Sequence, residues 1–425
     1  EPCVVARIVR LVPCSCEPLV VMALRLLHNL SFDARVREQM LRAGALPRLA
    51  ELLKKAPYRA RVLRLLYHLS AEDRCKAMFA YTEAVPIITQ LVVNFPRQVL
   101  AGELAALAVN LSLHPRNAEG MAAQHGLRNL TDKAVATRDP LVMKIVRNLS
   151  QWTYNLQANL ENPEKEYRHR GGALWGPCLE PLLELAVDAP DGGGNNGSNG
   201  GNGGSSGGHD LLVEVLGTLA NLTQLDMPKG ATWTLAWQNY RLSALVTRLL
   251  VPGMAQADVQ LEAIALVGAA AVDDGAARLL TGGPVLPAMH EALRDKGADA
   301  EIALQVLYAF WRLLHHPVSR HELLHGVGAV PAMLACLDHP RVPAIRRMAA
   351  AGLDLVLEFD RNEDGTVGEL GVQVRRHRFR SYNKEWLQYA ERAELGEERH
   401  VGGGGGRTDD DDGGRANSVD GDQAD

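Results

Sequence analysis

The chain has 425 residues, of which 47% are hydrophobic, 22% are charged and only 5% are aromatic. That length is enough for two or three ordinary domains or for one long repeat array with a sizeable core. Lysine and arginine total 45 against 50 aspartate and glutamate residues, a formal charge of -5, which argues against a general nucleic-acid-binding protein.

The first residues and the cysteines indicate the class of protein. The chain begins Glu1-Pro2 without a signal-like segment, so we expect its true N-terminus to lie upstream. Its six cysteines include only one close pair, Cys14 and Cys16, which favours reduced, mostly buried thiols in the cytosol over a disulfide framework. No uninterrupted apolar run reaches about 18 residues, so we expect no direct membrane insertion.

A short Asn-Leu-Ser element recurs along the chain with a period near forty residues. After each of the first three copies the next follows within 38 to 42 residues, and the next step is longer because a glycine tract intervenes. Weaker copies follow near Ala269, Arg312 and Val356. The position of the asparagine, which is a histidine in one copy, is occupied by Asn29, His68, Asn110, Asn148 and Asn221.

A second element, Gly-Ala-x-Pro and its variants, keeps the same period. Its prolines suit the first turn of a helix, where a missing N–H leaves no hydrogen bond unmade. Between the two elements the apolar spacing is helical, as at Val142, Ile145, Val146 and Leu149, and sustained alternation is lacking. The sequence therefore predicts an all-α armadillo-repeat solenoid, a right-handed superhelix of stacked helical repeats. The prolines are Pro47, Pro86, Pro287 and Pro331.

Low-complexity segments and the C-terminal pattern predict the domain boundaries. We expect the solenoid to span residues 1–358, with a flexible Gly-rich insertion at 191–208. An acidic, glycine-containing loop is expected at 359–374 and a helical element at 375–398. Residues 399–425, rich in glycine and aspartate, are expected to be disordered.

Two motifs resemble metal sites, and neither fits fully. His321-Glu322-Leu323-Leu324-His325 matches H-E-x-x-H, yet the repeat register places it on a helix that ends at Gly326, and the third-ligand position of the longer signature is Pro331. Asp360 to Gly365 matches the first half of a calcium loop, but position 12 is Gly371 instead of glutamate. We interpret the first motif as the surface of a helix and the second as a solvated loop, for which a weak calcium site is the alternative. We therefore expect no cofactor, no metal and no catalytic residue.

Two sets of residues are candidates for protein binding. A side-chain amide carries both donor and acceptor, so a row of asparagines can hold an extended peptide irrespective of its sequence. The alternative is that each amide satisfies a neighbouring helix end. The second set is the basic and aromatic cluster of the C-terminal element, which suits phosphate or an acidic protein surface and has a solvated cationic face as its alternative. Its candidate contacts are Arg378, Phe379, Arg380, Asn383, Trp386 and Leu387.

Several longer stretches resemble a particular family. Met78 to Thr82 running into Val85-Pro86, Met143 to Gln151, and Leu216 to Thr223 are similar to the kinesin-associated protein family, the non-motor accessory subunits of heterotrimeric kinesin-II. The resemblance covers about Leu24 to Arg392 and includes Phe379-Arg380, Asn383 and Trp386-Leu387. The glycine tract and the Asp360 to Gly371 loop depart from the family as insertions.

This resemblance implies a scaffold without catalysis. Family members bind the tail regions of the heterodimeric motor subunits and link the motor to cargo, including intraflagellar transport particles that move along microtubules toward the tip of the cilium or flagellum. It therefore implies a location in the cytoplasm, on microtubules and in the cilium with its basal body region. Two alternatives are an armadillo adaptor of the nuclear-import or junctional type, against which the irregular register of Trp152, Trp233, Trp237 and Trp311 counts, and a zinc protease using His321 and His325.

Overall fold

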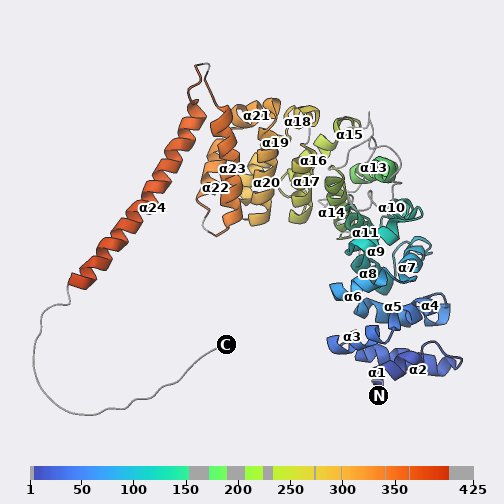
Figure 1. Ribbon diagram of the computed structural model, residues 1–425. Helices are drawn as coiled ribbons and strands as arrows, with labels where there is room; N and C mark the ends of the chain where they lie inside the picture. The colour runs from blue at the N-terminus through green and yellow to red at the C-terminus, as the bar shows by residue number, and fades with distance from the viewer. Residues whose placement is uncertain are drawn as a thin grey trace, which may run out of the picture. The chain divides into compact units, whose positions relative to one another are not determined.

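The computed structural model describes residues 4–401 except 153–171, 189–205, 224–232, 272–273, 298, 340 and 363. The described residues form helices throughout, and their only β-structure is one bridge between Arg361 and Val367. Two compact units separate between Phe359 and Asp360, one residue beyond the predicted end of the solenoid. The all-α repeat array expected from the sequence is confirmed (Figure 1).

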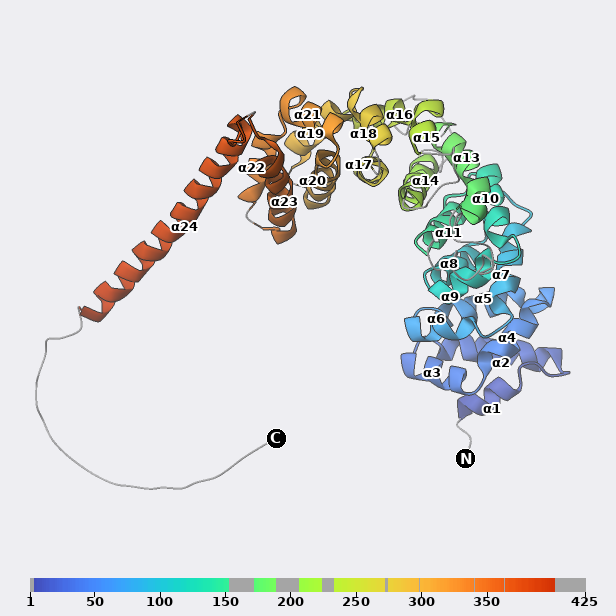
Figure 2. The same ribbon diagram turned by 45° about the horizontal axis from the view of Figure 1, so that its top comes forward.

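The first unit consists of three-helix repeats after a short helix α1 (Val4–Arg10). The third and usually longest helix of each repeat packs on the third helix of the next, from α2 to α23. Figure 2 shows α14, α17, α20 and α23 side by side in this arrangement. We call these helices the third-helix layer. They are α2 (Glu17–Leu30), α5 (Ala56–Leu69), α8 (Gly102–Ser112), α11 (Pro140–Ser150), α14 (Ser206–Leu222), α17 (Ala257–Ala270), α20 (Ala300–Leu314) and α23 (Pro343–Phe359).

The first and second helices of the repeats form two further layers. The first helices are α3 (Ala34–Arg42), α6 (Asp73–Phe79), α9 (Pro115–Ala122), α15 (Trp233–Asn239), α18 (Asp274–Thr281) and α21 (Pro317–His321), which continues into the π-helical turn η1 (Glu322–Gly326). The second helices are α4 (Ala45–Leu53), α7 (Ala84–Val93), α10 (Gly126–Thr137), α13 (Gly172–Asp188), α16 (Leu242–Leu250), α19 (Val285–Lys296) and α22 (Val330–Leu337). Neighbouring second helices contact one another from α4 through α13 and again from α16 to α22.

The two repeat markers have clear local causes. Every proline of the second marker lies in the first turn of a second helix, as expected. In two of these repeats a glycine turns the chain with a positive φ, +76° at Gly44 directly before α4 and +67° at Gly328, two residues before α22. This left-handed conformation costs an ordinary residue roughly 1–2 kcal/mol, which explains the glycine. His125 and Arg241 adopt it at the corresponding turns before α10 and α16.

Apolar burial holds the repeats together. The leucine of the Asn-Leu-Ser triplet is fully buried at Leu69, Leu111, Leu149 and Leu222. A buried leucine stabilises a fold by about 1.5–3 kcal/mol relative to an exposed one, so the triplet supplies core as well as polar contacts. The three weak copies, near Ala269, Arg312 and Val356, lie in α17, α20 and α23.

The second unit is one long helix preceded by a loop. Helix α24 (Glu369–Val401) begins six residues before the predicted element and includes all its candidate contacts. The predicted Gly-rich insertion lies mostly outside the described residues, and its last three residues, 206–208, belong to α14. The predicted tail from 402 onward also lies outside them.

Cysteine exposure differs from the expectation of mostly buried thiols. Cys75 and Cys178 are buried, and burial raises the pKa of both thiols. Cys14 and Cys16 are exposed because they lie in the loop between α1 and α2, where no helix covers them. All five cysteines of the described segments are free thiols.

Candidate protein-binding surface

The predicted asparagine row lies at the ends of the third helices and connects successive repeats. The Nδ2 atom of Asn110 donates a hydrogen bond to Oγ of Ser70 at 3.1 Å, and Asn148 donates to Ser112 at 2.9 Å. Asn221 donates to Ser150 in the same way, again at 2.9 Å. Each serine belongs to the triplet of the preceding repeat, so the triplets form a ladder along the layer.

Each serine hydroxyl is held in place by its own helix. Ser70 Oγ donates to the carbonyl of Tyr67 at 2.7 Å, and Ser112 and Ser150 make equivalent bonds. Because each hydroxyl donates its single proton to that carbonyl, its oxygen accepts a hydrogen bond from the asparagine amide of the next repeat. The asparagine amides therefore satisfy neighbouring helix ends, which was the alternative to peptide binding.

His68 occupies the position that is an asparagine in the other strong copies of the triplet. Its Nδ1 lies 2.7 Å from Oγ of Ser31, whose proton is donated to the carbonyl of His28. The geometry therefore assigns the proton to Nδ1 of His68, which donates as an asparagine amide would. Burial, together with His28 and Arg37, lowers the pKa of His68 and keeps the ring neutral.

The members of the row differ in exposure. Asn148 is 5% exposed and its amide also lies 3.4 Å from the carbonyl of Val109. Asn110 and Asn221 are partly exposed, whereas Asn29 is exposed. Access to a ligand is therefore greatest at Asn29 and least at Asn148.

A partly buried charge network crosses three third helices in the middle of the layer. Arg147 of α11 contacts Glu214 of α14 at 3.4 Å and makes a second ion pair with Glu262 of α17. It passes over Gly217, where a Cβ atom would lie 2.4 Å from its guanidinium carbon. Lys144 also pairs with Glu214 at 2.8 Å. The sequence pattern does not predict this network, because Arg147 and Glu262 lie in repeats separated by α14 and by the glycine tract.

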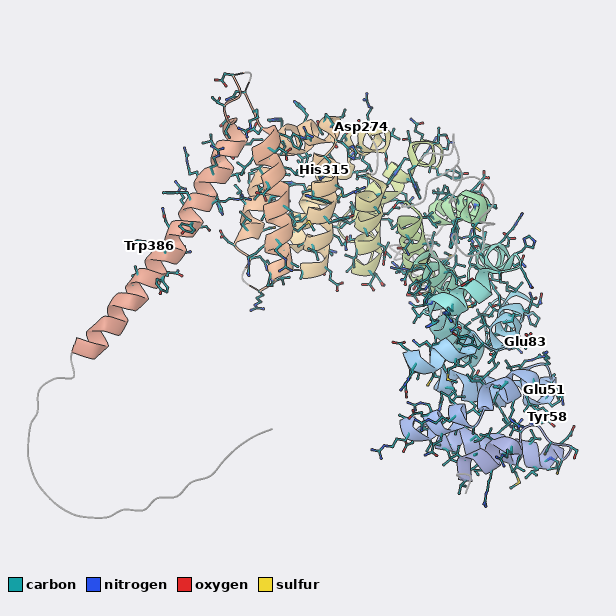
Figure 3. The ribbon with its side chains drawn as sticks, in the orientation of Figure 1. Glu51, Tyr58, Glu83, Asp274, His315 and Trp386 are labelled. Atoms are coloured by element: carbon teal, nitrogen blue, oxygen red, sulfur yellow. The ribbon has the colours of Figure 1, made fainter. Side chains whose placement is uncertain are left out.

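Aromatic side chains gather on the layer near its C-terminal end. On α20 the Tyr308 and Trp311 rings lie 6.0 Å apart, and Trp311 meets His315 edge to face at 4.9 Å. Tyr308 and Trp311 are partly exposed and His315 is exposed (Figure 3). Their spacing of three and four residues on one helix is the signal by which the sequence could have revealed them.

The candidate contacts of the C-terminal element lie on α24. Phe379 and Trp386 are 68% and 60% exposed, and Arg380 is exposed. Arg378 and Asn383 are partly exposed, and the side chain of Leu387 lies outside the described residues. Figure 3 labels Trp386 on this helix.

The two motifs that resemble metal sites have the following geometry. The exposed rings of His321 and His325 lie 5.0 Å apart across the junction of α21 and η1, which ends at Gly326 as expected. In the loop before α24, Gly365 has a φ of +80°, and Asp360 accepts a hydrogen bond from the backbone of Gly371 at 2.7 Å. Within the described ranges, no three His, Cys, Asp or Glu side chains are grouped as metal ligands would be.

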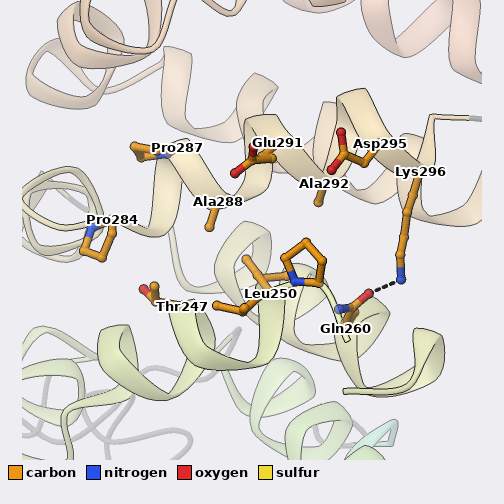
Figure 4. Close-up of a pocket in the computed structure, with 12 residues that line it drawn as sticks. Thr247, Leu250, Gln260, Pro284, Pro287, Ala288, Glu291, Ala292, Asp295 and Lys296 are labelled. Atoms are coloured by element: carbon orange, nitrogen blue, oxygen red, sulfur yellow. Dashed lines mark hydrogen bonds between the residues drawn. The ribbon is translucent and has the colours of Figure 1, made fainter. Parts of the chain in front are cut away.

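A groove lies between two second helices, α16 and α19. It has a volume of about 340 Å³ and is lined by apolar side chains that include Leu250, Pro252 and Pro287. Glu291 and Asp295 also line it, and Lys296 donates a hydrogen bond to Gln260 (Figure 4). The sequence pattern does not predict this groove.

The model of the kinesin-associated protein (KAP) family matches residues 1–162 and 205–416. These ranges span most of the chain, including α24 and every described helix of the array except α13. The chain belongs to the kinesin-associated protein family. The KAP resemblance found in the sequence is thereby confirmed, and it associates the chain with kinesins.

Two solved structures are similar to this KAP chain at low identity. One is an engineered protein, 13% identical, with a TM-score of 0.33 over 83% of this chain and 98% of that one. The other is a designed armadillo repeat protein in complex with the peptide (KR)4, 14% identical, with a TM-score of 0.33 over 83% and 99% of the two chains.

None of the helices in the described segments combines the length and the apolar character that crossing a bilayer requires.

Proposed function

We propose that this KAP chain is a non-catalytic scaffold of heterotrimeric kinesin-II. It binds the tail regions of the two motor subunits and links the motor to cargo, including particles of anterograde intraflagellar transport. This role places it in the cytoplasm, on microtubules and in the cilium or flagellum with its basal body region. The observation that carries the proposal is the family match over residues 1–162 and 205–416.

The third-helix layer is the surface that suits the motor tails. Its first two helices expose Met22, Leu26 and Tyr67 beside Arg25 and Arg64. Such a row of apolar and cationic side chains at a regular repeat spacing favours an extended or helical ligand that contacts several repeats. The partly exposed aromatic side chains of α20 extend the same kind of surface toward the C-terminal end.

Within this layer we propose the asparagine row, Asn29, His68, Asn110, Asn148 and Asn221, as the first contact. The ladder geometry divides its members between two tasks. Asn29 is free to bind a ligand directly, while the others act through the repeat stacking that their amides support. The C-terminal element on α24 is the second contact, through Arg378, Phe379, Arg380, Asn383, Trp386 and Leu387.

The test is co-purification of the full chain with heterodimeric kinesin-II tails, followed by titration of the purified partners. We expect a stable complex for the wild-type chain. Asn29→Ala with Asn221→Ala should weaken it several-fold, because one direct contact and one repeat junction are lost. Failure of the wild-type chain to bind the tails would contradict the proposal.

The matched control is Asn94→Ala. Asn94 is also an exposed asparagine at a helix end, but it follows the second helix α7 and its amide bonds only within that segment, to Gln90 at 3.2 Å. We expect binding by this variant to be unchanged. Equal binding by the Asn29/Asn221 variant and the wild-type chain would remove the asparagine row from the interface and leave the scaffold role standing.

A further inference from the structure

Helix α24 carries an exposed aromatic face. Phe379, Tyr382, Trp386 and Tyr389 are 68%, 71%, 60% and 74% exposed, and we call them the α24 seam. They make up half of the eight exposed aromatic side chains in the described part of the chain, within eleven residues. Exposed apolar clusters of this kind mark interaction surfaces.

The spacing of the seam indicates the shape of its partner. Its residues are separated by three, four and three positions, and Val372 and Arg375 continue the pattern toward the start of the helix. An apolar repeat of about 3.5 residues keeps one stripe of a helix facing a second helix. The geometry of α24 therefore fits an α-helix lying alongside it better than an extended peptide.

The charge around the seam indicates the chemistry of that helix. Between 375 and 384 the chain has five cations, Arg375, Arg376, Arg378, Arg380 and Lys384, and no acid. Arg375 lies on the stripe itself, and Arg376 and Arg378 hold the flanking positions where coiled coils place their interhelical ion pairs. A partner with acidic residues opposite these positions is electrostatically complementary.

A second copy of this chain is a poorer occupant in either direction. In a parallel pair, Arg375 on the stripe would face Arg375 of the other copy. In an antiparallel pair that stacks Phe379 on Tyr389, the register brings Arg378 beside Arg392 and Glu385 beside Glu385. Like charges at these positions disfavour pairing.

We propose that the α24 seam binds an amphipathic α-helix of a partner protein, with an apolar heptad stripe and acidic flanking residues. The proposal rests on the proposed function in that α24 is its second contact, and it specifies what that contact recognises. The partner helix covers the aromatic side chains, and its carboxylates pair with Arg376 and Arg378.

The experiment titrates the full chain into two labelled synthetic helices and follows fluorescence anisotropy. Both helices carry leucine at the stripe positions, and they differ only in having glutamate or lysine at every flanking position. We expect the glutamate helix to bind at least tenfold more tightly than the lysine helix, with affinity falling as salt is added. Phe379→Ala with Trp386→Ala should weaken binding of the glutamate helix at least tenfold.

The control variant is Gln373→Ala with Gln388→Ala, which changes two exposed residues of α24 away from the seam. It should bind the glutamate helix as the wild-type chain does. Equal affinity for the two synthetic helices, or binding unaffected by loss of Phe379 and Trp386, would overturn the proposal. So would a dimer of the wild-type chain, seen by light scattering, that the Phe379/Trp386 variant dissolves.

The same variants separate this proposal from the proposed function. If the Phe379/Trp386 variant loses the glutamate helix but still co-purifies with the motor tails, the seam serves another partner and the scaffold role stands. If the wild-type chain binds the glutamate helix but not the motor tails, the proposed function fails and the seam proposal stands.

Discussion

Single residues of the third-helix layer are placed by contacts between repeats. The side chains of Glu214 and Glu262 are only 9% and 16% exposed, and both face the guanidinium of Arg147. Burial raises the pKa of Glu262 above its usual 4.5, while the ion pair with Arg147 opposes that shift only in part. Desolvation of the carboxylate thus outweighs its attraction to Arg147.

This raised pKa predicts a pH-dependent contribution to stability. A carboxyl whose pKa is higher in the folded than in the unfolded state gains stability as the pH falls through the folded pKa, and the gain is complete below the unfolded value. The wild-type chain should therefore gain free energy of unfolding relative to Glu262→Gln as the pH falls from neutral through the raised pKa to below the unfolded value of 4.5. Urea unfolding of both proteins at several pH values measures this difference. A difference that stays constant or shrinks toward low pH would contradict the raised pKa.

The asparagine row shows what a residue pattern does and does not reveal. The period of the triplet located Asn110, Asn148 and Asn221 correctly at the ends of third helices. The direction of their amides depends on the serine of the preceding repeat, and that contact exists only once the repeats stack. The serine of the triplet was the available signal, since a hydroxyl fixed by its own helix offers an acceptor to the next repeat.

At the level of helices, Gly217 of α14 leaves space for the side chain of Arg147 to extend across α14 and contact Glu262 of α17. A Cβ atom on α14 would displace the guanidinium of Arg147, because it would lie 2.4 Å from Cζ. The glycine costs its helix about 1 kcal/mol relative to alanine, and it leaves the space through which Arg147 reaches Glu214 and Glu262. The sequence could not predict this contact, because nothing in the periodicity identifies which glycine lies beneath a side chain from another repeat.

A double-mutant cycle tests this role of Gly217. Gly217→Ala should destabilise the wild-type chain by about 1–3 kcal/mol, because Arg147 loses its buried partners. In an Arg147→Ala background the same change should stabilise the chain by up to about 1 kcal/mol, since alanine favours the helix. The measurement is urea unfolding of the four proteins. The same destabilisation in both backgrounds would show that the glycine does not act through Arg147.

Helix α24 illustrates the other limit of sequence analysis. The basic and aromatic composition of 375–387 predicted a contact region, but Tyr382 and Tyr389 were not among its candidates. They share one face with Phe379 and Trp386 only because the helix is continuous from Glu369 to Val401. The glycines at 368 and 371 made it difficult to predict from the sequence that this helix begins before residue 375.

At the scale of the molecule, the array was predictable because each repeat contacts mainly its neighbours. Two markers with one period therefore determine the order of the helices and their layers, without long-range contacts that a sequence pattern cannot express. The choice of binding partner, in contrast, cannot be predicted from the repeat period. It depends on which exposed side chains of the third-helix layer and of α24 meet another chain, and the family match gives the kinesin association that periodicity alone does not contain.

The third-helix layer is the proposed binding surface for the tails of the kinesin-II motor subunits. Photo-cross-linking tests it most directly, with a photoreactive residue placed at Leu26 or Tyr67 in the layer, or at Gln90 on the second helix α7; all three positions are exposed. We predict cross-links to the motor tails from Leu26 and Tyr67 and none from Gln90. Cross-links from Gln90 without any from Leu26 and Tyr67 would contradict the account.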